Sequence, residues 1–296
     1  MALVVFAVCM VSYSGPMVKG ALNEGASPIS VALLRMLAAA LLMLPYEARQ
    51  CVRRHIPMKL TPAQWGLTAL AAAFLAAHYI TWITSLTGTS TFASVALVCT
   101  QPLFVAFFSY VLFHERTPRR ALPGALLALL GAVTIALSGL SGQEAQATGQ
   151  EALRSNLLAL AGAVLMAAHW LAGRQIRQTL AAEVYTPVLY LITALLLALC
   201  LPLSGGFRMP LSALPYMAGL VIGSTLLGHA VFAYALSGVS ANVISFALLG
   251  EPVGAMIFSM IFFGEVPTWP VALGGLLTLM GLALYLAFAG GEKQPA

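Results

Sequence analysis

Residues 101–131 read QPLFVAFFSYVLFHERTPRRALPGALLALLG, and residues 251–281 read EPVGAMIFSMIFFGEVPTWPVALGGLLTLMG. The two stretches lie 150 positions apart and share the pairs Pro102/Pro252, Phe108-Ser109/Phe258-Ser259, Phe113/Phe263, Glu115/Glu265, Gly124/Gly274 and Gly131/Gly281. An offset of about half the chain between matching apolar segments indicates one membrane-embedded unit that was duplicated and fused. Internal duplication of this kind points towards transport.

The composition places most of the chain in a lipid bilayer. Hydrophobic residues make up 60% of the sequence and charged residues 8%, and the mean hydropathy is +0.94. A soluble domain carries about 25% charged residues. The four cysteines are scattered and form no C-x-x-C pair, so neither a disulfide nor a metal site is expected. We expect no soluble domain and no cofactor.

The apolar runs are long enough to cross a membrane as helices. A transmembrane helix needs about 20 apolar residues, and only helices or closed barrels satisfy the backbone inside lipid. The runs lack the alternation of a barrel. The sequence therefore predicts an all-α membrane protein with ten transmembrane helices, at roughly 2–19, 28–46, 63–86, 90–113, 119–140, 154–173, 186–204, 213–236, 240–263 and 269–289.

The positive charges predict the orientation of these helices. With both termini in the cytoplasm, ten Lys and Arg residues fall in inner loops or the C-terminal tail and three fall outside, namely Lys19, Arg154 and Arg208. The positive-inside rule selects that arrangement. The net charge of +5 is thus a signal of topology. The basic residues are not gathered on one face of a soluble element, so binding to nucleic acid is not expected.

Ten spans in two copies put five spans in each copy. Because five is odd, the second copy enters the bilayer from the opposite side, and the halves form an inverted repeat. We predict a first five-helix repeat at 1–140, an external linker at 141–153 and a second five-helix repeat at 154–296.

The paired segments carry a family resemblance. Gln101-Pro102 through Glu115 and Glu251-Pro252 through Glu265, each followed by two glycines seven residues apart, resemble the EamA-type drug/metabolite transporter superfamily. The resemblance covers both halves, and amino-acid exporters of the YddG type are the nearest subgroup. It implies a ten-helix carrier that moves small metabolites, often outward, through a central cavity. The predicted helices three, four, eight and nine, with one and six, would line that cavity, and helices five and ten would act as scaffold.

Glu251 is the acidic residue placed most clearly inside a predicted span. A charged side chain at the centre of a bilayer costs about 2.5–3.5 kcal/mol on insertion scales, so it calls for an explanation. Glu251 either takes up a proton during transport or pairs with a cationic group of the substrate; the alternative is a carboxylate near the helix start that faces water or backbone. Its counterpart in the first repeat is Gln101. Pro102 and Pro252, which follow, predict helix kinks, either for function or for packing alone.

Three histidines fall within predicted spans: His78, His169 and His229. The repeat relates His78 to His229 within one residue, so both would face a shared cavity. Histidine can hydrogen-bond a substrate or relay a proton near neutral pH. The alternative for each is a structural hydrogen bond between helices.

Aromatic residues accompany these positions, and one further charge lies within a span. Tyr13, Tyr79, Trp82 and Trp170 could stack on a substrate or hold a cation over a ring, although Trp and Tyr also form belts at membrane surfaces. Together with Gln101, Glu251 and the three histidines they make up the predicted substrate-binding residues. Arg35 could attract a substrate carboxylate, but its nearness to Pro28 favours a side chain that snorkels to the outer surface.

The sequence contains no phosphate-binding loop and no H-E-x-x-H motif, so we do not expect an enzyme. We expect a secondary transporter that exports small metabolites, amino acids above all, across the inner (plasma) membrane by alternating access, driven by a gradient of protons, another ion or the substrate. A ten-helix fused duplicate is expected to act as a monomer. The alternatives are a multidrug exporter of lipophilic cations, a channel-like facilitator, and an accessory subunit of a membrane complex.

Overall fold

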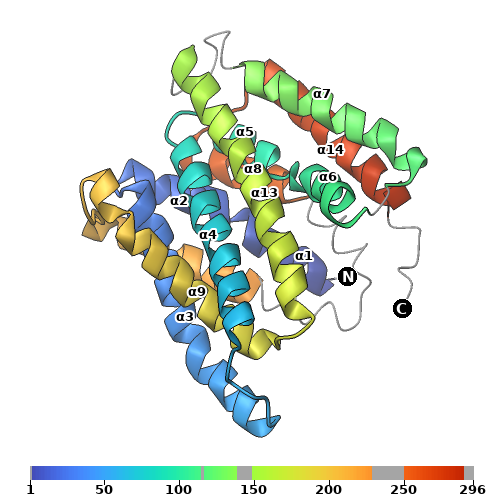
Figure 1. The fold of residues 1–296 in the computed structure, drawn as a ribbon. Helices are drawn as coiled ribbons and strands as arrows, with labels where there is room; N and C mark the ends of the chain where they lie inside the picture. The colour runs from blue at the N-terminus through green and yellow to red at the C-terminus, as the bar shows by residue number, and fades with distance from the viewer. Residues whose placement is uncertain (1, 115–116, 139–148, 229–249, 290–296) are drawn as a thin grey trace.

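The computed structural model describes residues 2–114, 117–138, 149–228 and 250–289. These segments form helices and contain no strand, which confirms the all-α prediction for the described part of the chain (Figure 1). Along the chain the helices are α1 Ala2–Ser12, α2 Ser14–Asn23, α3 Pro28–Arg53, α4 Pro62–Ser85, α5 Thr91–Val98, α6 Gln101–Phe113, η1 Arg119–Ala121, α7 Leu122–Ser138, α8 Gln150–Arg177, α9 Ala182–Leu199, η3 Leu201–Ser204, η4 Leu211–Ala213, α10 Leu214–Ala218, η5 Gly219–Gly228, α13 Gly250–Phe263 and α14 Trp269–Ala289.

Seven helical stretches in the described segments are long and apolar enough to cross a membrane. They are Pro28–Arg53, Pro62–Ser85, Thr91–Phe113, Arg119–Ser138, Gln150–Arg177, Ala182–Leu199 and Trp269–Phe288. The other three predicted spans contain shorter helices: α1 with α2, the stretch Leu211–Leu227, and α13. Residues 229–249, which belong to two of those three spans, lie outside the described part.

Local capping sets where the two longest helices of the first half begin. The Ser27 side chain accepts a hydrogen bond from the Ser30 N–H and Pro28 opens α3, while Thr61 and Gln64 form a capping box before α4. The α3 helix continues to Arg53, beyond the end predicted at residue 46. Hydropathy marks only the apolar part of a helix, and the polar residues from Glu47 onward are themselves good helix formers.

Two spans of the first half are interrupted near their middle. The α1 helix ends at Ser12, and α5 ends at Val98. Each of these residues lies four positions before a proline, Pro16 or Pro102, whose missing N–H cannot bond the carbonyl of that residue. In the second half, η5 is a π-helix, a form that is rare and often occurs at functional sites. Three different elements near the middle of the bundle thus depart from regular α-helix.

The helices α7 and α14 pack so closely that only glycine fits at their points of contact. Figure 1 shows them side by side along one edge of the bundle, with α3 beside α9 on the opposite side. A methyl group at Gly124 would lie 2.7 Å from the Gly281 carbonyl oxygen, and one at Gly274 would lie 2.8 Å from the Gly131 carbonyl oxygen. The 150-residue repeat converts the first contact into the second. The glycine pairs that revealed the repeat are therefore the residues that let these helices touch.

A methyl group at Gly131 tests this packing. Gly131→Ala would push the new methyl into the backbone of α14 at Thr278 and Gly274, which cannot move aside as a flexible side chain can. Overpacking of this kind costs about 1–3 kcal/mol. We expect a lower thermal unfolding midpoint for the detergent-purified variant. Gly66→Ala is the matched control, because a methyl there meets no atom within 4 Å. An unchanged midpoint for Gly131→Ala would contradict the packing described here.

Candidate functional site

The guanidinium of Arg35 lies inside the protein, between helices of both halves of the chain. Arg35 is 4% exposed. Its Nε donates a hydrogen bond to Thr225 Oγ1 in η5 (3.1 Å), and its Nη1 donates to Ser14 Oγ at the start of α2 (3.2 Å). The guanidinium carbon lies 5.0 Å from the ring centroid of Tyr79 and 6.0 Å from that of Trp82. The prediction that Arg35 snorkels to the surface is therefore wrong, because two hydroxyls and two aromatic rings solvate its charge in the interior.

One face of α4 brings three of the predicted site residues together. The rings of His78 and Trp82 stack at 5.8 Å with an interplanar angle of 14°, and the ring of Tyr79 lies 5.1 Å from that of His78. Residues four apart on a helix lie above one another, which explains the stack. The His78 Nδ1 lies 2.9 Å from the Gly162 carbonyl oxygen of α8 and must donate to it, since a carbonyl only accepts. All three side chains are buried.

Several buried polar atoms have no hydrogen-bond partner in the described part of the chain. They include Trp82 Nε1, Gln101 Oε1, Ser12 Oγ and Ser224 Oγ. Buried polar groups are nearly always paired, so each exception calls for an explanation. Trp82 lies against Arg35, and Ser12 and Ser224 lie within two residues of its hydrogen-bond partners Ser14 and Thr225, which marks this region as a candidate binding site.

Glu251 lies at the beginning of the described part of α13 and is half-buried. It forms no ion pair within the described segments, yet it lies within electrostatic range of Arg35 and of Cys99, at the break between α5 and α6. The following residue, Pro252, is buried. Gly254 faces the first span, because a methyl there would lie 2.6 Å from Ser12 Cβ. The carboxylate of Glu251 thus belongs to the same central region as the guanidinium.

The remaining predicted residues divide between this region and its edges. Tyr13 packs edge-on against Phe258 and Phe262 of α13, at 5.3 and 5.8 Å. The Nδ1 of His169 donates to the Ala71 carbonyl oxygen (2.9 Å), which joins α8 to α4 as a structural hydrogen bond would. Trp170 is 44% exposed. Gln101 is half-buried at the start of α6, directly after the break that precedes Pro102. The last predicted residue, His229, lies outside the described segments.

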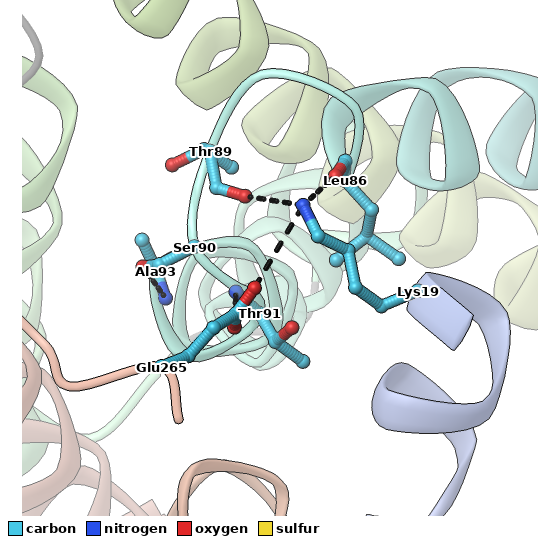
Figure 2. Close-up of polar contacts among 7 residues, drawn as sticks. All are labelled: Lys19, Leu86, Thr89, Ser90, Thr91, Ala93 and Glu265. Carbon is cyan, nitrogen blue, oxygen red and sulfur yellow. Dashed lines mark hydrogen bonds and ion pairs between the residues drawn. The ribbon is translucent and has the colours of Figure 1, made fainter. Parts of the chain in front are cut away.

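A second polar centre joins both halves of the chain at one end of the bundle, which we call the Lys19 end. Lys19 is 1% exposed, and its Nζ donates to the backbone oxygens of Leu86 and Thr89 in the turn between α4 and α5. The Nζ also lies 3.8 Å from Glu265 Oε1, in the loop between α13 and α14. Figure 2 shows the lysine reaching from α2 to these three partners.

The network at the Lys19 end extends beyond the ion pair. The Oε2 of Glu265 accepts a hydrogen bond from the Thr91 N–H at the start of α5 (3.1 Å). Thr89 Oγ1 donates to Asn156 Oδ1 of α8 (2.7 Å). Sequence reasoning missed this centre: it counted Lys19 as an outer positive charge and named Glu265 as a repeated residue of the paired segments. The Glu repeated at the ends of the paired segments could have marked Glu265 as important. Its partner Lys19 is far away in the sequence and comes near only in the folded chain.

Different contacts join the helices at the opposite end. Arg54 Nη1 lies 2.8 Å from Glu183 Oε1, which links the ends of α3 and α9, and both groups are more accessible than the Lys19 pair. Gln64 Nε2 donates to the Thr179 carbonyl oxygen (3.1 Å). Among the described residues, no group of three or more His, Cys, Asp or Glu side chains is arranged to hold a metal ion.

Comparison with known proteins agrees with this architecture. The EamA-like transporter family matches residues 1–137 and, a second time, residues 153–287. No curated protein matches the chain. A solved structure described only as the crystal structure of a protein is 19% identical, covers 98% of this chain and 97% of its own, and superposes with a TM-score of 0.66. That likeness concerns the fold, whereas the two family matches together span both halves. The chain therefore belongs to the EamA-like transporter family.

Proposed function

We propose that this protein is a secondary transporter that exports small metabolites, in particular amino acids, across the inner membrane by alternating access. Family membership makes it a multi-pass membrane protein and a transporter of small molecules. The observation that carries the finer proposal is the buried network at the Lys19 end, which ties the first half of the chain to the second beside a central polar region. Alternating access needs such a contact, which holds one end closed and can separate.

The contacts between loops support the proposed ten-helix topology with both termini in the cytoplasm. Segments predicted to lie outside meet one another at the Lys19 end, as do Thr89 and Asn156. Segments predicted to lie inside meet at the other end, as do Arg54 and Glu183. The reciprocal glycine contacts between α7 and α14 are those that a two-fold relation between inverted repeats would produce. In this topology the Lys19 end faces outward, and the structure corresponds to an outwardly closed state.

The burial of the Lys19–Glu265 pair suits a contact that separates during transport. Taking both charges out of water is costly, and removing one partner from a buried pair costs about 3–5 kcal/mol because the other charge is left uncompensated. When the outer end opens, water can solvate both groups. The closed state is thus stabilised by an interaction whose net free energy is small, so modest substrate binding energy can shift the balance.

Glu251 is the carboxylate that we assign to the transport cycle. It is half-buried beside the break in the fourth predicted span and within range of Arg35. A carboxylate in that position can hold a substrate ammonium group or carry a proton, and His78 stacks on Trp82 beside Arg35. The buried charge of Arg35 disfavours a lipophilic cation that has no carboxylate of its own. The observations therefore favour amino acids over the multidrug alternative.

Substitution of the central residues tests the transport proposal. We expect Glu251→Gln to lower the uptake of labelled amino acids by proteoliposomes at least about tenfold, since loss of a charged hydrogen-bond partner is worth about 1.5–3 kcal/mol. His78→Ala should lower uptake less, because it removes a ring that supports Trp82. Glu183→Gln is the matched control, since its exposed pair with Arg54 contributes little. Uptake at the normal rate in both central variants would exclude these side chains from the mechanism. Linear uptake without counterflow would indicate a channel-like facilitator instead.

The network at the Lys19 end can be tested separately by thiol labelling. In a protein that keeps only Cys99, an impermeant thiol reagent added from outside should react faster after Glu265→Gln, by about fivefold or more, because the uncompensated Lys19 charge draws water into the closed end. The double variant Lys19→Met with Glu265→Gln buries no charge and should react at nearly the original rate. Equal rates in all three proteins would show that an uncompensated Lys19 charge does not open this end, and would contradict the proposed role of the pair.

A further inference from the structure

Arg35 is a buried cation solvated by neutral groups. Its two hydrogen bonds go to hydroxyls of Ser14 and Thr225, and two aromatic rings lie against it. In the described part of the chain, no Glu forms an ion pair with it. Glu251 lies within electrostatic range of Arg35 but forms no ion pair with it. A charge buried in this way is expensive in an apolar bundle, and intramembrane charges of this kind mark substrate pathways.

The hydrogen-bonding capacity around Arg35 is only partly used. A guanidinium carries five N–H donors, and the two hydrogen bonds to Thr225 and Ser14 use one from Nε and one from Nη1. The indole Nε1–H of Trp82 can only donate, and it is buried with no acceptor among the described residues. The guanidinium carbon lies 6.0 Å from the ring of this same tryptophan. Two neighbouring groups therefore carry donors that no acceptor in the described part of the chain uses.

The two hydroxyls that hold Arg35 come from opposite halves of the chain. Ser14 opens α2 directly after the break in the first span. Thr225 belongs to the π-helix η5, and its hydroxyl donates to the Leu220 carbonyl oxygen (3.1 Å), which directs a lone pair of Oγ1 to the Arg35 Nε. The guanidinium is thus positioned by side chains on both sides of the interface that must move during transport. A ligand on Arg35 would act on the relative position of the halves.

From these observations we infer that Arg35 and the Trp82 indole form the subsite for the carboxylate of the substrate. The inference rests on the proposed function and deepens it, because it names the chemical class of the cargo. A carboxylate accepts through both oxygens and compensates the guanidinium charge, a pairing for which the planar fork of arginine is well suited. Glu251 takes the ammonium group of the same molecule. The site therefore recognises zwitterionic α-amino acids by both charged groups and rejects the corresponding amines, which lack the carboxylate.

A matched pair of ligands tests this inference. We expect the wild-type protein in proteoliposomes to exchange labelled phenylalanine and to be inhibited by unlabelled phenylalanine far more strongly than by phenethylamine, which differs only by the carboxylate. Arg35→Gln should weaken inhibition by phenylalanine at least about tenfold and leave that by phenethylamine unchanged or stronger, since a charged hydrogen bond is lost and the repulsion of amines is removed. Arg35→Lys should recover part of the discrimination.

A second variant keeps the test decisive if Arg35→Gln does not fold. Trp82→Phe keeps an aromatic ring beside His78 and Arg35 but removes the Nε1–H, and it should weaken phenylalanine inhibition several-fold without changing that of the amine. Trp269→Phe is the control, since Trp269 is 82% exposed. Equal loss of both ligands in the Arg35 and Trp82 variants, or wild-type protein that does not distinguish the two, overturns the carboxylate subsite while the transporter proposal stands. Wild-type protein that exchanges no amino acid overturns the proposed export of amino acids, and this inference with it.

Discussion

The charge of Arg35 lies in the interior of an apolar helical bundle, where only the protein can solvate it. The surrounding structure reflects that requirement. The break in the first span places the Ser14 hydroxyl beside the guanidinium, the π-helix η5 places Thr225 on its other side, and α4 supplies the rings of Tyr79 and Trp82. The first span and η5 depart from regular α-helix at this point, and α4 places two aromatic side chains here. The central polar region is therefore organised around one cation.

Two buried cations have different roles in the proposed cycle: Arg35 binds the substrate, and Lys19 closes one end. Arg35 lies in the centre and forms no ion pair with a described residue, whereas Lys19 lies at one end and is paired with Glu265. Both connect the first half of the chain to the second, Arg35 through Thr225 and Lys19 through Glu265. A substrate that binds in the centre and an ion pair that closes the end thus act on the same interface between halves. Such a shared interface is what couples binding to conformational change.

Sequence reasoning was most successful for features that depend on local patterns. Apolar length predicted the all-helical class, and the repeated segments carried the resemblance to the family that matches residues 1–137 and 153–287. The contacts of the His78 ring with Tyr79 and Trp82 on α4 follow from helical spacing. The position of Arg35 and the pairing of Lys19 with Glu265 could not be read in this way. Each depends on contacts between residues far apart in the chain, and the depth of a charge in a span does not reveal which helices surround it.

The central claim is that the Lys19 end opens and closes around a bound amino acid. Spin labels at Thr87 and Val266, two exposed positions flanking the Lys19–Glu265 contact, would report the separation between the α4–α5 turn and the α13–α14 loop in a protein whose native cysteines have been replaced. The account predicts two distance populations in lipid, with a ratio that changes when an amino acid is added and does not change with the corresponding amine. A single distance that is insensitive to both ligands would contradict it.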